Sequence, residues 1–123
     1  MTKITPIIFL VSLMTVISQI FLKKGLIKIG GIQINNFSEF TKSFLKLIQE
    51  KYIIIGILIA AFAAFSWLII ISKKDLTLTF PIAGGIFYIL LFLFSWLFLG
   101  ENITTWKIIG TTTILIGVAI ILK

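Results

Sequence analysis

Long uncharged apolar runs, separated by short polar links, are the dominant pattern along the chain. Four runs have membrane-spanning length: residues 4–22, 52–72, 76–99 and 103–122. A helix rising about 1.5 Å per residue needs about 20 residues to cross a hydrocarbon core of about 30 Å. Lys107 is a charged residue inside these runs, and it lies near the start of the fourth, where a long side chain reaches the headgroups. The pattern predicts four transmembrane helices in a single domain, residues 1–123.

Residues 23–51 form the longest link, and glycines are expected to interrupt the helix there. Gly25, Gly30 and Gly31 follow the lysine pair that ends the first run. Asn36, followed three residues later by an acid, then has the pattern of a helix N-cap with its return partner.

An amphipathic segment follows that cap. Its apolar residues recur at helical spacing, with lysines and an acid mostly between them: Phe37, Phe40, Phe44, Leu47 and Ile48, against Lys42, Lys46 and Glu50. We favour a short helix over residues 37–50 that lies in the membrane interface. The alternative is that these residues simply extend the second span into water.

The other links are short, residues 73–75 and 100–102, so consecutive helices are expected to be antiparallel neighbours in an up-down bundle. The lysines lean towards the side of the first and third links, which carry seven: Lys23, Lys24, Lys28, Lys42, Lys46, Lys51 and Lys107. The other side carries four: Lys3, Lys73, Lys74 and Lys123. By the positive-inside rule both termini would face outward, but a difference of three leaves the orientation, and dual insertion, open.

Composition supports a membrane location and excludes most chemistry. Of 123 residues, 59% are hydrophobic and 12% charged, whereas a soluble domain has about 25% charged residues. The chain contains no His and no Cys, so His- or Cys-ligated metals, thiol nucleophiles and disulfides are excluded, and we expect no metal and no cofactor. The four acids show no pairing for acid–base catalysis, so no catalytic residue and no enzyme is expected. The formal net charge of +7 comes from lysines at membrane edges, where anionic lipids rather than nucleic acid are the expected partner.

Polar residues inside the first span form a stripe. Ser12, Thr15 and Gln19 fall at i, i+3 and i+7, with Ser18 beside them. An amide in hydrocarbon costs several kcal/mol unless it finds a partner, so this stripe must face protein, water or substrate. For Ser12 and Thr15 we favour interhelical hydrogen bonding over substrate contact, and for Gln19 both alternatives stay open.

Glycines mark the third and fourth spans. Gly84 and Gly85 precede Tyr88 on the same face, and adjacent glycines indicate either close packing or a hinge. Gly110, Thr113 and Gly117 share one stripe of the fourth span and predict a seam for a second helix.

These residues resemble the small multidrug resistance family. The segment from Lys107 through Gly110 and Gly117 resembles that family's last helix, where glycines at this spacing form the dimer seam. Ser95-Trp-Leu-Phe-Leu-Gly-Glu101 resembles the end of its third helix and the wider drug/metabolite transporter superfamily. The resemblance covers all four spans but not the long first link.

One departure changes the function that this resemblance implies. The family's proton-coupled exporters carry a glutamate midway along the first helix, and Thr15 stands in that place. Ser18-Gln-Ile-Phe-Leu-Lys23 is instead similar to the Gly-Gln-x-x-x-Lys stretch of the subunits that flip aminoarabinose-phosphoundecaprenol, and Leu78-Thr-Phe-Pro81 resembles their Ala-Tyr-Pro entry to helix three. The relatives of that branch also lack the glutamate.

The resemblance implies a multi-pass transporter of the inner (plasma) membrane that flips a polyprenyl-phosphate-linked sugar or similar amphipathic lipid. The polar path would comprise these residues: Ser12, Thr15, Ser18, Gln19, Gly84, Gly85 and Tyr88. Lys23 and Lys24 would attract the phosphate, and Gly110, Thr113 and Gly117 would join two protomers. We expect a homodimer, with an antiparallel arrangement favoured, or a heterodimer with a paralogue. The alternatives are an exporter of small amphipathic metabolites or cationic drugs, and a non-transporting structural subunit of a membrane glycosyltransferase or other heteromer.

Overall fold

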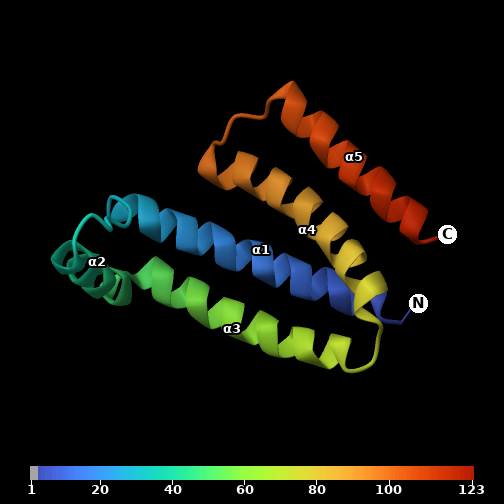
Figure 1. The fold of residues 1–123 in the computed structure, drawn as a ribbon, viewed down its shortest axis with the longest axis horizontal. Coiled ribbons are helices and arrows are strands. Elements are labelled where there is room, and N and C mark those ends of the chain that lie inside the picture. Colours follow the sequence, from blue (N-terminus) through green and yellow to red (C-terminus); the bar gives the residue numbers. More distant parts are fainter. Residues whose placement is uncertain (1–2) are drawn as a thin grey trace.

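The structure is a computed structural model that describes residues 3–123. These residues form five helices: α1 (Thr5–Lys28), α2 (Phe37–Gln49), α3 (Lys51–Ile71), α4 (Leu76–Leu99) and α5 (Thr105–Ile121). Three of the four predicted spans correspond to the long helices α1, α3 and α4, the fourth corresponds to the shorter α5, and the predicted amphipathic segment corresponds to α2. The chain reverses direction between consecutive long helices, so the up-down order is present (Figure 1).

The end of the first helix was predicted too early. The sequence pattern placed it at residue 22, but α1 continues through Lys23, Lys24 and Gly25 to Lys28. Lysine is a good helix former, so a charge pair ends an apolar run without ending a helix. Gly25 is buried against Ile53 of α3, and a Cβ added there would collide with the Ile53 side chain. This glycine therefore serves close helix packing and is not the chain break that we expected.

Helix α1 is the centre of the fold, with α3 on one side and α4 on the other (Figure 1). One core cluster joins Ile8 and Val11 of α1 to Ala63 and Ile70 of α3. A second cluster joins Val16 and Ile20 of α1 to Leu90 of α4. Because α1 occupies the middle, α3 and α4 diverge from the short link at residues 72–75 towards their other ends (Figure 1).

Helix α5 lies on the outer side of α4, away from α1 and α3 (Figure 1). No residue of the described range Thr105–Ile121 is buried, so α5 adds nothing to either core cluster. It packs through Val118 and Leu115 onto the buried Gly85 of α4. The four long helices therefore form a row, α3–α1–α4–α5, with α1 covered on two sides and α5 at the edge.

The link after α1 turns at Gly30 and Gly31, which have φ angles of 80° and 81°, as expected for glycines at a helix end. Asn36 is the N-cap residue of α2, as predicted, but its side chain makes no capping hydrogen bond within the described residues. Glu50 has extended backbone angles, φ −84° and ψ 121°, so α2 ends before α3 begins. The alternative in which residues 37–50 continue the second span is therefore wrong.

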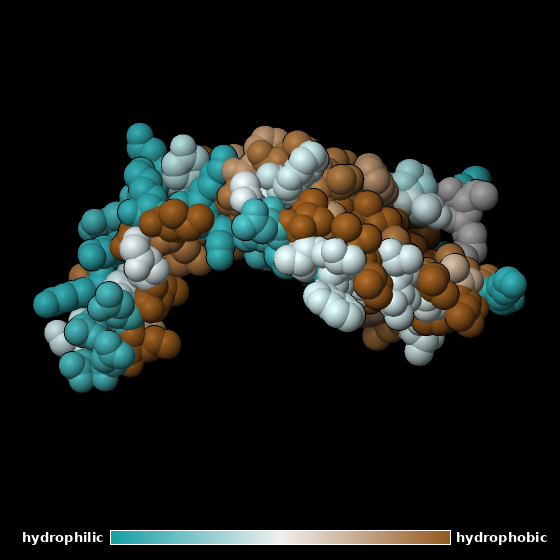
Figure 2. All heavy atoms as spheres, turned by 90° about the horizontal axis from the view of Figure 1, so that it is seen from above, coloured by the Kyte–Doolittle hydropathy of each residue, from teal (hydrophilic) through white to brown (hydrophobic). Residues whose placement is uncertain are grey.

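Apolar side chains cover most of the helix surfaces. On α3, Phe62 and Phe65 are 63% and 65% exposed. Among the described residues, α1, α3 and α4 are long and apolar enough to span a membrane, whereas α5 is a shorter apolar helix of 17 residues. Figure 2 shows hydrophobic side chains over the middle of one face and hydrophilic ones gathered at its α2 end. A surface of this kind is stable in lipid and would aggregate in water, so the chain has the character of an all-helical membrane protein.

Candidate functional site

The hydroxyl groups of the α1 stripe are already hydrogen-bonded. Ser12 and Ser18 are buried, and Ser12 Oγ donates to the Ala83 carbonyl of α4 at 3.5 Å. Thr15 Oγ1 and Ser18 Oγ donate to carbonyls one turn earlier in α1, at 2.8 Å and 2.7 Å. Ser12 therefore contributes one long interhelical hydrogen bond, and the other two hydroxyls are satisfied within their own helix.

These hydroxyl residues line a cavity of about 340 Å³ between α1, α3 and α4, which we call the serine cavity. Its other walls combine small residues, including Ala60 and Ala63 of α3 and Gly84 of α4, with the aromatic rings of Trp67, Phe80 and Phe87. The serine cavity brings together five residues of the predicted polar path: Ser12, Thr15, Ser18, Gln19 and Gly84.

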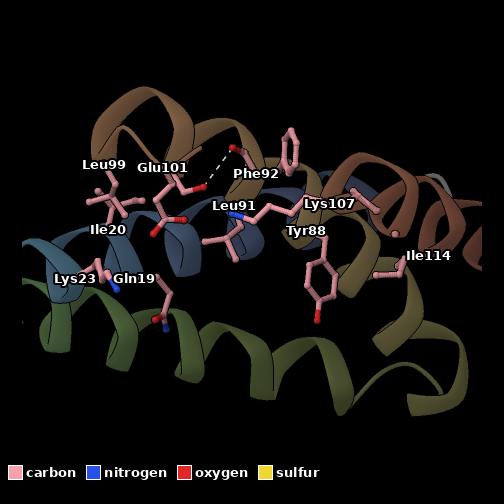
Figure 3. A pocket seen from close by; sticks show the side chains of 13 residues that line it. Gln19, Ile20, Lys23, Tyr88, Leu91, Phe92, Leu99, Glu101, Lys107 and Ile114 are labelled. Atoms are coloured by element: carbon pink, nitrogen blue, oxygen red, sulfur yellow. Dashed lines mark hydrogen bonds between the residues drawn. The ribbon is translucent and has the colours of Figure 1, made fainter. Parts of the chain in front are cut away.

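A second cavity, of about 550 Å³, lies between α1, α4 and α5 and is called here the α5 cavity. Gln19 and Lys23 of α1 line it together with Tyr88 of α4 (Figure 3). Glu101 and Lys107, from the α4–α5 link and the start of α5, complete its charged lining (Figure 3). Gln19 also lines the serine cavity, so this residue lies between the two spaces.

Gln19 and Tyr88 are polar groups without a partner in residues 3–123. The structure contains no hydrogen bond from the described residues to the Gln19 amide or to the Tyr88 hydroxyl. The two side chains point in the same direction in Figure 3, Gln19 from α1 and Tyr88 from α4. An unpaired amide within an apolar span costs several kcal/mol, so water, a ligand or another chain must supply partners for Gln19.

The adjacent lysines of α1 face different spaces. Lys23 lines the α5 cavity, whereas the Lys24 ammonium lies 5.7 Å from the centre of the Phe98 ring, in a separate aromatic-lined cavity. Consecutive helical residues differ by about 100° around the axis, which sends these two side chains in different directions. This arrangement therefore does not favour a single phosphate held by both lysines.

The two adjacent glycines of α4 also have different surroundings. Gly84 opens onto the serine cavity, and no described heavy atom lies within 4 Å of a Cβ built there. A Cβ on Gly85 would lie 3.3 Å from Val118 Cγ2 of α5. Gly85 thus lies at the α4–α5 contact and lines neither cavity, while Tyr88 lies one turn after Gly84 in the α5 cavity.

The residues predicted to join two protomers lie on the open side of α5. A Cβ built on Gly110 or Gly117 meets no described heavy atom within 4 Å. Thr113 Oγ1 donates to the Ile109 carbonyl at 2.9 Å, so its hydroxyl is satisfied within α5. Gly110 also lines the α5 cavity, which places one end of this stripe at the edge of that space.

Sequence reasoning missed Glu101 and Lys107 as lining residues. Gly100, with φ 64°, ends α4 in the left-handed conformation and directs the chain back towards α5. Lys107 Nζ donates to the Asn102 carbonyl at 2.9 Å, and within residues 3–123 Glu101 forms no ion pair with Lys23 or Lys107. The two lysines and one acid give this end of the cavity a net positive charge.

The described residues bring no three His, Cys, Asp or Glu side chains together in a metal-binding group. The available polar chemistry is therefore that of ammonium groups, one amide, hydroxyls and one carboxylate. No family model, curated protein or solved structure matches this chain. Function is accordingly inferred from the site and from the family resemblance described above.

Proposed function

We propose that the chain is a membrane transporter of the small multidrug resistance type that moves an anionic, lipid-linked substrate between leaflets. A polyprenyl-phosphate-linked sugar fits this description. The observation that carries the proposal is the α5 cavity, in which the unpaired Gln19 amide lies in the same space as Lys23 and Tyr88. An amide and a phenol can bind sugar hydroxyls, and an ammonium can bind a phosphate.

Charge favours an anionic over a cationic substrate. Lys23 and Lys107 outnumber Glu101 in the cavity lining, and the apolar middle of the spans holds no acid to pair a cation. An unpaired cation in a low-dielectric site is costly. The apolar lining of the same cavity, from residues such as Leu91 and Ile114, suits the start of a polyprenyl chain whose remainder stays in lipid.

The transporter would have four spans, one interfacial helix and two protomers, in the inner (plasma) membrane. Helix α5 is about 25 Å long and would span by local bilayer thinning together with its apolar flanks at Ile103 and Leu122. Exposed Phe37 and Phe44 on α2 would enter the lipid while Lys42 and Lys46 face the headgroups. The open stripe at Gly110 and Gly117 would face the second protomer, whose residues would also line the transport path.

Leaflet exchange in reconstituted vesicles tests the proposal. The purified chain is placed in liposomes with a fluorescent polyprenyl-phosphate sugar, and the fraction protected from a membrane-impermeant quencher is followed with time. Loss of a hydrogen bond to a charged or polar substrate group costs about 1.5 to 3 kcal/mol, so Lys23→Gln should slow exchange by about tenfold or more. Gln19→Ala should slow it similarly.

Lys74→Gln is the matched control, because Lys74 is an exposed lysine in the link at the opposite end of the helices. It should exchange lipid at the unsubstituted rate. No exchange by the unsubstituted chain, or equal rates for Gln19→Ala and Lys74→Gln, would count against the transporter.

A structural subunit is the second candidate, and the open α5 face favours it. With no buried residue in Thr105–Ile121, this helix is available to another membrane protein. Co-purification of a stoichiometric heteromer that transports lipid, combined with no exchange by this chain alone, would favour the subunit over the independent transporter.

A further inference from the structure

A third cavity, of about 350 Å³, has no lining residue from α5, and we call it the aromatic cavity. Ile17, Phe21 and Lys24 of α1 line it at helical spacing. Tyr52 at the start of α3 and Phe94 and Phe98 near the end of α4 complete its walls. Its lining residues Tyr52 and Phe98 lie at the end of the helices where α3 and α4 diverge (Figure 1).

Aromatic contacts support the walls of this cavity. The Phe21 and Tyr52 ring centres are 6.1 Å apart, and those of Phe94 and Phe98 are 5.5 Å apart. Both pairs lie within the range of favourable aromatic contacts. The aromatic cavity is partly open to the surroundings of the helices, and its mostly apolar walls favour hydrocarbon over water. In a bilayer the molecules available to fill it are lipid chains, which restore the dispersion contacts that an empty space forfeits.

Lys24 determines which lipid would fit. Its ammonium lies over Phe98 with no acidic partner in residues 3–123. The neighbouring Lys28 ammonium, by contrast, is paired with Glu50 Oε1 at 3.0 Å and lies 5.5 Å from the Tyr52 ring centre. An unpaired cation at the edge of an apolar cavity, where the charged end of the helices meets the headgroups, is complementary to a lipid phosphate.

We propose that the aromatic cavity binds one acyl chain of an anionic phospholipid, with its phosphate at Lys24, as a lipid that stays with the protein. This goes beyond the proposed transport function, because it concerns a different cavity and a lipid that is not carried. Ile20 is buried and lines both spaces, so it forms the wall between the α5 cavity and this site. The lysine pair is thereby divided: Lys23 belongs to the α5 cavity and Lys24 to the retained lipid.

Native mass spectrometry of the full chain, released from detergent, tests this division. The protein is titrated with phosphatidylglycerol and with phosphatidylcholine that carry identical acyl chains. Both lipids present a phosphate, but the choline cation of phosphatidylcholine offsets its charge and repels the Lys24 ammonium, so phosphatidylglycerol should bind several-fold more tightly. Lys24→Gln should remove this preference, and Lys24→Arg should keep it.

Lys23→Gln is the matched control, since it removes the same charge from the next residue of the same helix. It should keep the phosphatidylglycerol preference. Phe98→Ala removes a wall of the cavity and leaves the charge of Lys24, so it should weaken the binding of both lipids. Thermal unfolding in detergent establishes that each variant is folded before it is compared.

Three results would overturn the proposal. They are equal affinity for the two lipids, equal loss of binding in Lys23→Gln and Lys24→Gln, and a spectrum of dimers with no lipid attached, which would assign the cavity to a second copy of the chain. Millimolar inorganic phosphate should not displace the lipid, because it offers no chain to fill the aromatic walls. Displacement by phosphate would be a fourth contradicting result, because it would show an anion site without a lipid chain. Each of these readouts is independent of lipid flux.

Discussion

The close approach of α1 and α3 depends on Gly56, and Gly56→Ala measures how tightly these helices are packed. A Cβ added at Gly56 would lie 2.8 Å from Leu22 Cγ and 2.9 Å from Leu22 Cδ2 of α1. It would also lie 3.1 Å from the Leu22 backbone nitrogen. A side chain can rotate away from such a contact, but a helix backbone cannot. The substitution therefore requires α1 and α3 to move apart.

The expected cost follows from these distances. Non-bonded carbon atoms are most favourable about 3.5 to 4.0 Å apart, so the helices must separate by roughly 0.5 to 1 Å, which forfeits a quarter to a half of the neighbouring dispersion contacts. Overpacking of this kind costs about 1 to 3 kcal/mol. Alanine regains about 1 kcal/mol of helix propensity relative to glycine. With the backbone nitrogen involved, we expect a net loss of about 1 to 2 kcal/mol in the free energy of unfolding.

Unfolding by sodium dodecyl sulfate in mixed micelles, followed by tryptophan fluorescence, provides the assay. Gly117→Ala is the matched control, because the same methyl group on the open side of α5 meets no described heavy atom within 4 Å. In the monomer this control should be neutral or up to about 1 kcal/mol more stable. If Gly56→Ala is as stable as Gly117→Ala, the packing of α1 on α3 is looser than the structure has it.

Three further predictions use the same unfolding assay. Gly100→Ala should lower the free energy of unfolding by about 1 to 2 kcal/mol, because the φ of 64° at this helix end is strained for any residue with a Cβ. An unchanged unfolding midpoint would contradict the left-handed cap. Ser12→Ala should lower the free energy of unfolding by about 0.6 kcal/mol or less, since the 3.5 Å hydrogen bond from Ser12 to the Ala83 carbonyl is long. A loss above about 2 kcal/mol would mean that the Ser12 hydroxyl bonds to more than one partner. Glu50→Gln should lower the free energy of unfolding by less than about 1 kcal/mol, because the Lys28 side chain of its ion pair is 59% exposed. The difference in unfolding free energy should shrink in high salt. A difference that does not depend on salt would assign Glu50 a role other than this ion pair.

The helices could be predicted from the sequence because their determinants are local. Apolar runs without charges can satisfy their backbone in lipid only as helices, so run length predicts each long helix. Helix α4 begins at Leu76 and ends at Leu99, where its predicted span begins and ends. The prediction of where α1 ends was wrong because a tertiary contact decides it. Gly25 is acceptable inside a helix here since Ile53 occupies the space that a side chain would take, and a single sequence contains no sign of that neighbour.

The candidate site was predictable only within one helix. The stripe of Ser12 and Thr15 follows from helical periodicity, and both residues line one cavity. Separation of Lys23 from Lys24 could have been foreseen, since adjacent helical positions point in different directions. That Glu101 lines the same cavity as Lys23 could not be foreseen, because it depends on how α4 packs on α1 and how the turn at Gly100 is directed.

The placement of α5 has a consequence for how a cavity between helices could change shape. Both core clusters consist of residues from α1, α3 and α4 with their neighbours in the same helices, and neither contains a residue of α5. The contact of Val118 with Gly85 is instead a small one at the edge of the row. Rotation of α5 about this contact would widen or narrow the α5 cavity while both core clusters stay intact, whereas a helix movement that widens the aromatic cavity would separate α1 from α3 or α4. The space that we assign to transport is therefore bordered by a helix that lies outside both core clusters, and the space that we assign to a retained lipid is bordered only by helices that the core holds together.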